Sequence, residues 1–225
     1  MFFDYQMLTV RKLLDTAPLY GERGVYSISG VLRDMICNVK HFTREAIFAA
    51  ENRPYSWSIP NDRDKQWGDW LNTIRRHKTI DWLTGVTESN RRPTDRVRLD
   101  VLEFLNIRLT TNCKEIIQHT NKFVAHSATA ASRTSAPHRT PTLGQIWKAQ
   151  KAIHQTANFI SIDLLGRNNI GGVPSAAFDQ LKHIERPLVK VRQIQELQVE
   201  WTKYSDQVES WCQFRPEDLE REMQS

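Results

Sequence analysis

Six polar side chains that could take part in acid–base or anion-binding chemistry recur within one stretch of the sequence, residues 95–127. Spaced as on a helix, they are Arg108, Asn112, Glu115, His119, Lys122 and His126. At about 100° per residue they follow one edge of an apolar stripe made of Val101, Leu105, Leu109, Ile116 and Phe123. A histidine transfers protons near neutral pH, and a cation stabilises charge on phosphate oxygens. The pattern is typical of a site at a helix–helix or subunit interface, and equally of an ordinary boundary between core and solvent.

The end of this stretch resembles the signature of a known superfamily. The string HTNKFVAHS, residues 119–127, is similar to the motif of the HEPN superfamily (higher eukaryotes and prokaryotes nucleotide-binding), and more narrowly of its abortive-infection branch. In that branch a polar-basic pair precedes a small apolar stretch that ends in Ala-His. Asn121, Lys122, Ala125 and His126 stand in the matching places.

The N-terminal segment adds to this resemblance. The string LTVRKLLDTAPLYGERGVYSISGVLRDM is similar to the branch's opening helix, in which an Arg and an Asp lie one turn apart, followed by a loop and a Ser-started helix. Here the two residues are Arg11 and Asp15. At i, i+4 spacing they could also form only a surface ion pair. The resemblance extends over residues 5–165.

The family implies both a fold and a chemistry. Its members are helical bundles, usually homodimers, whose motif helices face a shared cleft, and active members use an Arg and a His to cut RNA without a metal. Carried over to this chain, His126 is the proton-transfer residue and Asn121 its polar partner. His119, Arg11 and Asp15 are accessory candidates.

One position departs from the family's pattern. The residue before Asn121, where the catalytic arginine is expected, is Thr120, which supplies a hydroxyl and no charge. Either another cation replaces the arginine or the protein binds without cutting. The basic residues available as substitutes are Lys122, Arg108, Arg133 and Arg139.

Two functions therefore follow from the sequence. The first is a dimeric, RNA-acting protein, a metal-independent endoribonuclease in bacterial defence or in a toxin–antitoxin system with a cognate antitoxin. The second is a catalytically inactive RNA- or protein-binding helical module, which Thr120 favours. Thr120 leaves open whether the chain is an enzyme.

The elements that must position these residues are predicted to be helices. Apolar residues recur at helical spacing and no segment alternates for long with period two. We expect helices over residues 2–17, from Ser27 or Ser29 to about Asn52, from Asn61 or Asp62 towards Gly85, over 94–127, over 142–166 and over about 187–211, with a charged tail after them. The sequence predicts an all-α bundle of six to seven helices. Residues 1–165 would form the HEPN-like bundle, and residues 166–225 a helical extension packed on the same domain.

Composition limits the classes of protein to which the chain could belong. The net charge of +5 favours anionic partners, and the 40% hydrophobic content suits a globular core. Three scattered cysteines suit a reducing compartment, no apolar run approaches the length of a membrane span, and the N-terminal residues do not resemble a signal peptide. We therefore expect a cytoplasmic protein. Zinc spacing, a phosphate-binding Gly-rich loop and paired Glu-x-x-His elements are missing from the sequence, so neither a metal nor a cofactor is expected.

Overall fold

The computed structural model describes residues 2–20, 22, 24–53, 55, 63–124, 140–167 and 193–225. Within these residues the regular elements are helices and none is a strand, which confirms the predicted all-α class. The α-helices are α1 (Phe2–Leu13), α2 (Ile28–Cys37), α3 (Arg44–Ala50), α4 (Arg63–Thr84), α5 (Leu99–His119), α7 (Leu143–Asn158), α8 (Ile194–Trp211) and α9 (Pro216–Gln224). None of the helices in this part of the chain is both long enough and apolar enough to span a membrane.

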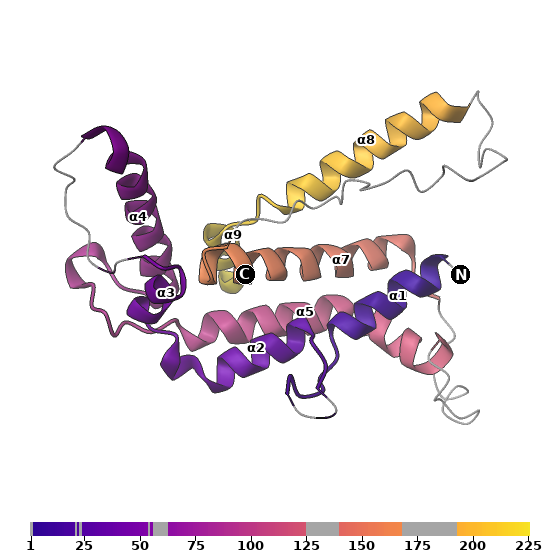
Figure 1. Cartoon of the computed structure of the whole chain (residues 1–225). Coiled ribbons are helices and arrows are strands. Elements are labelled where there is room, and N and C mark those ends of the chain that lie inside the picture. Colours follow the sequence, from indigo (N-terminus) through magenta and orange to yellow (C-terminus); the bar gives the residue numbers. More distant parts are fainter. Residues whose placement is uncertain are drawn as a thin grey trace.

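Helix α5 lies at the centre of the bundle. Figure 1 shows α7 running along one side of it and α2 along the other, while α1 crosses near its C-terminal end and packs against both α5 and α7. The apolar side chains of α5 that face these helices are fully buried: Val101, Leu102, Leu105, Leu109 and Cys113. Burial of a large aliphatic side chain contributes about 1.5–3 kcal/mol, so this stripe is the main source of stability for the α5 packing.

The predicted single helix from Ser27 or Ser29 to Asn52 is wrong, because the chain breaks in its middle. Helix α2 ends at Cys37, and a 3₁₀ turn, Val39–His41, leads to a new start at α3. The side chain of Thr43 accepts a hydrogen bond from the N–H of Ala46 and so caps α3. Ser27 caps α2 in the same way, through the N–H of Gly30.

The C-terminal residues expected to be a charged tail form helix α9. Pro216 occupies its first turn, where a missing N–H has no cost, and Glu217 and Asp218 face the positive end of the helix dipole. Leu219 is fully buried in the same hydrophobic core as α5. Together with the split of the second helix, this raises the number of α-helices in the described residues to eight.

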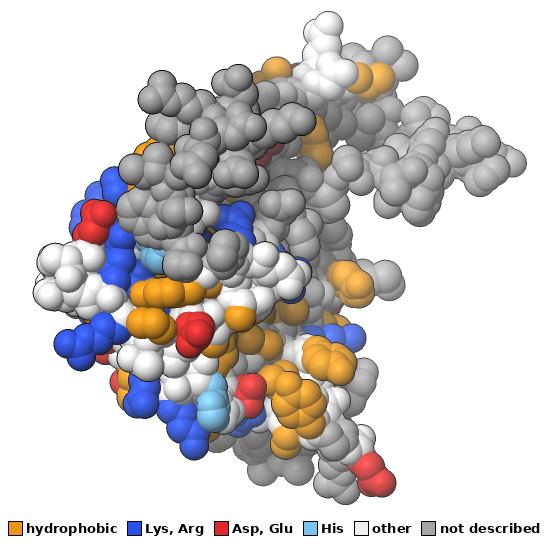
Figure 2. Space-filling model, turned by 60° about the vertical axis from the view of Figure 1, so that its left-hand side comes forward, with side chains coloured by type: hydrophobic (Ala, Val, Ile, Leu, Met, Phe, Trp, Pro, Cys, Tyr) orange, Lys and Arg blue, Asp and Glu red, His pale blue; other side chains and the backbone are white. Residues whose placement is uncertain are grey.

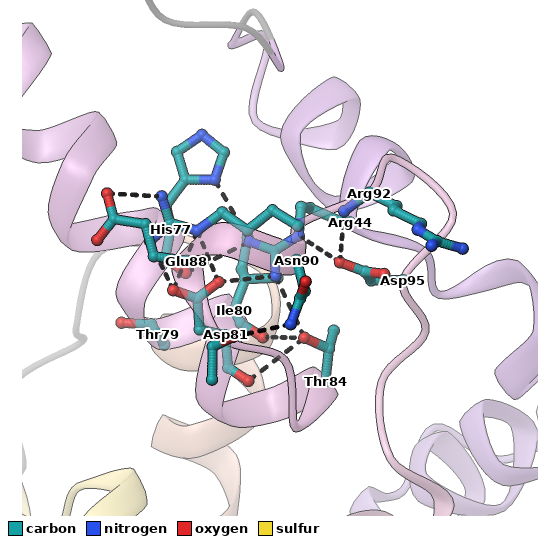
Figure 3. Close-up of polar contacts among 12 residues, drawn as sticks. Arg44, His77, Thr79, Ile80, Asp81, Thr84, Glu88, Asn90, Arg92 and Asp95 are labelled. Atoms are coloured by element: carbon teal, nitrogen blue, oxygen red, sulfur yellow. Dashed lines mark hydrogen bonds and ion pairs between the residues drawn. The ribbon is translucent and has the colours of Figure 1, made fainter.

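A buried arginine joins α3, α4 and the segment before α5. The Arg44 side chain is fully buried, and its guanidinium donates to Asp81 at 2.8 Å and to Asp95 at 3.3 Å (Figure 3). Arg91 also pairs with Asp81, at 2.6 Å. Burial alone would raise the pKa of Asp81, but the hydrogen bonds from Arg91 and Arg44 lower it below its ordinary value. This cluster ties α3 and α4 to the N-terminal end of α5, whereas residues 119–124 lie at the C-terminal end of that helix.

Candidate functional site

The string that resembles the HEPN motif, residues 119–127, begins at the last residue of α5, where the α-helix gives way to a π-helix. The regular helix ends at His119, and the chain continues as a π-helical turn, Thr120–Val124. Such wide turns are frequently found at functional sites. The extra residue in the turn changes the direction of the side chains that follow. Asn121 and Lys122 therefore do not continue the faces of α5 that a uniform helix would give them.

Thr120 faces the core. Its side chain is fully buried, and its hydroxyl donates to the backbone carbonyl of Ile116 at 2.7 Å. The position at which the family's arginine is expected therefore points away from solvent in this chain. A charged side chain there would have to be desolvated, at a cost of several kcal/mol.

An arginine from the other end of the sequence instead reaches the motif. Arg11 lies in the last turn of α1, and its Nε donates to Oδ1 of Asn121 at 2.6 Å across 110 residues of sequence. Asn121 is exposed and Arg11 half-buried. The packing of α1 against α5 and the π-helical turn brings the two side chains together.

Arg11 and Asn121 line a groove of about 560 Å³ between α1, α2 and α5. The other lining residues are Leu14, Asp15, Thr16, Ser29, Arg33, Ile36, Glu103, Asn106, Thr110 and Ile117. Asp15 accepts a hydrogen bond from the N–H of Ala17 at 2.8 Å, and Arg33 donates to the carbonyls of Thr16 and Ala17. The groove thus combines two guanidinium groups with two carboxylates and several neutral polar groups.

Part of this groove was not predicted from the sequence. Glu103, Asn106, Thr110 and Ile117 lie at helical spacing along α5, so they form a stripe of their own, and Asn121 follows them in the π-helical turn. That stripe could have been found by the same periodicity that selected the opposite edge. No pattern in the sequence selects Arg33, because its position in the groove depends on how α2 packs against α5.

Arg108, one of the candidate substitute cations, is used on a different side of the bundle. Its Nε donates to Glu222 of α9 at 2.6 Å, and its guanidinium also contacts Gln155 of α7. The guanidinium carbon lies 4.8 Å from the ring centre of Phe214. With only 9% of its side chain exposed, Arg108 connects α5 to α7 and α9 and does not line the groove.

The remaining sequence candidates fall into two groups. His119 and Lys122 are half-buried, and the His119 ring lies 5.1 Å from that of Phe123. His126, Arg133 and Arg139 lie outside the described residues, so their roles stay predictions. Within the residues that the structure describes, no group of three or more His, Cys, Asp or Glu side chains could hold a metal ion.

No protein-family model matches the chain, and no curated protein or solved structure shows significant similarity to it.

Proposed function

We propose that the groove between α1, α2 and α5 binds RNA, and that the chain is a HEPN-like, metal-independent endoribonuclease. The observation that carries the proposal is the hydrogen bond between Arg11 and Asn121. It places a guanidinium beside the motif that the sequence relates to RNA cleavage. Arg11 then supplies the positive charge that Thr120 cannot provide.

The chemistry of Arg11 suits this role. A guanidinium carries five N–H donors in a rigid fork, and Asn121 takes one of them. The hydrogen bond fixes the plane of the fork while leaving donors to bind phosphate oxygens, with which arginine forms paired, charge-assisted hydrogen bonds. Asn121 thereby acts as a positioning residue for the cation.

The reaction we propose is attack of a ribose 2′-hydroxyl on the adjacent phosphate. The 2′-hydroxyl gives up its proton as its oxygen bonds to phosphorus, the bond from phosphorus to the 5′-oxygen breaks, and the 5′-oxygen takes up a proton, which leaves a 2′,3′-cyclic phosphate. His126 gives or accepts a proton in this step, since an imidazole with an ordinary pKa of about 6.5 does both near neutral pH. Arg11 stabilises the charge on the phosphate oxygens.

Positive charge elsewhere on the surface supports an anionic partner. The α3–α4 end of the bundle, which comes forward in Figure 2, shows Lys and Arg side chains spread over its surface. The exposed basic residues of this region include Lys40, Arg75, Lys78, Arg92 and Arg96. Such charges attract nucleic acid without reading its sequence.

The wider setting follows from the family resemblance. We propose a cytoplasmic homodimer whose two motifs share one cleft, acting in bacterial defence or with a cognate antitoxin. A second function, RNA binding without cleavage, is favoured by one observation: the family's arginine position is buried and occupied by Thr120.

One experiment separates these two functions. Purified wild-type protein and His126→Ala are incubated with total cellular RNA in excess EDTA. Cleavage by the wild type alone supports the nuclease, whereas binding without cleavage by either protein supports the inactive module. Cleavage that persists in His126→Ala contradicts the proposed mechanism.

A further inference from the structure

The groove between α1, α2 and α5 contains a pair of polar side chains, far from Arg11, that take no part in the proposed reaction. Glu103 and Asn106 both line the groove and lie three residues apart on α5. Residues at this spacing are neighbours on a helix face, with about 5–6 Å between their Cβ atoms. At about 1.5 Å per residue, Glu103 lies roughly 25 Å along the helix axis from Asn121.

Other polar groups of the groove are already engaged within the protein. Asp15 accepts a hydrogen bond from the N–H of Ala17, and the hydroxyl of Thr110 donates to the carbonyl of Asn106 at 2.8 Å. Among the residues that the structure describes, the side chains of Glu103 and Asn106 have no such partner. Glu103 is exposed and Asn106 half-buried, so both side chains can bind a ligand that enters the groove.

The carboxylate of Glu103 determines which part of an RNA fits beside it. A carboxylate repels phosphate and only accepts hydrogen bonds, so it suits a base that presents N–H donors. Guanine is the RNA base with two adjacent donors, N1–H and the 2-amino group, next to an acceptor, O6. The two carboxylate oxygens accept from both donors, and the amide nitrogen of Asn106 donates to O6. Unpaired bases of single-stranded RNA are recognised through this Watson–Crick edge.

We propose that Glu103 and Asn106 form a guanine-binding subsite of the groove, separated from the phosphate that Arg11 holds. The inference rests on the proposed RNA-binding function. Stacked nucleotides rise about 3.4 Å each, so the guanine and the phosphate are at most about seven nucleotides apart, and fewer in an extended strand. The preferred ligand is therefore a single-stranded RNA with an unpaired guanine at a fixed distance from the bound phosphate.

The test compares three fluorescent oligonucleotides that differ at one base. Each is a 2′-O-methyl uridine strand longer than the groove, which carries at one position a guanine, an inosine or another uridine, and anisotropy measures its affinity. Inosine lacks only the 2-amino donor of guanine. We expect the guanine strand to bind about tenfold more tightly than the uridine strand, and the inosine strand to lose most of this gain, because a good bidentate pair discriminates by about 1–3 kcal/mol.

Glu103→Gln identifies the group that recognises the base. This variant should bind the guanine and uridine strands with similar affinity, while its affinity for the uridine strand stays the same or rises because a charge that repels phosphate is gone. Glu45→Gln, at an exposed position of α3, is the matched control and should keep the full preference for guanine.

The outcomes separate this subsite from the proposed function. Wild-type protein that binds all three strands equally overturns the guanine subsite and leaves RNA binding by the groove intact. A preference for guanine that survives Glu103→Gln overturns the role of this carboxylate. Failure of the wild-type protein to bind any of the strands overturns both the subsite and the proposed function.

Discussion

Nε of Arg11 lies 2.6 Å from Oδ1 of Asn121, so the first helix of the chain supplies a cation to a motif 110 residues later. The contact exists because the C-terminal turn of α1 packs beside the π-helical turn that ends α5. Under the proposed function, this guanidinium supplies the positive charge that Thr120 does not provide.

An arginine introduced at position 120 should destabilise the protein and should not increase RNA cleavage. Thr120→Arg would place a charge where the side chain is fully buried, and we expect it to lower the free energy of unfolding by several kcal/mol without increasing RNA cleavage. Urea denaturation and the EDTA cleavage assay measure the two effects, with Thr120→Ser as the control that keeps the hydroxyl. A stable Thr120→Arg protein with raised cleavage would show that position 120 can face the groove.

Arg44 should be among the most sensitive positions for stability. Arg44→Met leaves Asp95 without its buried cation and Asp81 with Arg91 alone, and breaking a buried pair costs about 3–5 kcal/mol. The matched control is Arg92→Ala, which removes an exposed guanidinium and should change stability by less than about 0.5 kcal/mol. Equal denaturation midpoints for the two variants would contradict the structural role of Arg44.

Asp163 should make the stability of the protein depend on pH. Burial raises the pKa of this carboxyl to about 6 from its ordinary value of 3.8, although Arg215 and Arg76 partly oppose the rise. A raised folded-state pKa favours the protonated form, so this contribution is complete below about pH 3.8 and is lost as the pH rises through 6. At pH 7.5 the ionised, buried carboxylate destabilises the fold by up to about 3 kcal/mol.

Asp163→Asn removes that ionisation while keeping the shape of the side chain. We expect it to stabilise the protein at pH 7.5, with the gain shrinking by roughly half at pH 5 because the wild-type carboxyl becomes protonated. Asp206→Asn, at an exposed position of α8, is the control and should show no such trend. A gain from Asp163→Asn that is the same at both pH values would contradict a raised pKa.

The helices could be predicted because their periodic apolar residues pack in one core. The long pattern of apolar residues that ends at Phe123 predicted the helix observed as α5. Thr142 and Gly166 were predicted as the ends of the segment that forms α7 and its π-helical end. The break before α3 was missed because Thr43 and Arg44 are held by the distant residues Arg96 and Asp95, through a β-bridge and a backbone hydrogen bond. A pattern of apolar residues cannot predict such backbone contacts between distant segments.

The candidate site was predictable only in part. Asn121, Arg11 and Asp15 were selected by resemblance, yet their meeting in one groove depends on how α1 lies across α5. Arg108 was selected by the periodicity of α5, but its partners Gln155 and Glu222 come from helices whose orientation the sequence does not give. Contacts between side chains of distant segments depend on the tertiary structure, and the spacing of residues along one helix cannot predict them.

RNA affinity shows whether Arg11 is the RNA-binding cation of the groove. A fluorescent single-stranded RNA with 2′-O-methyl riboses cannot be cleaved by the proposed route, so anisotropy measures binding alone. We expect Arg11→Ala to weaken binding about tenfold, equivalent to about 1.4 kcal/mol, and Lys12→Ala, its exposed neighbour on α1, to weaken it no more than about threefold. An equal loss of RNA affinity in both variants, or no loss in Arg11→Ala, would contradict this role of Arg11.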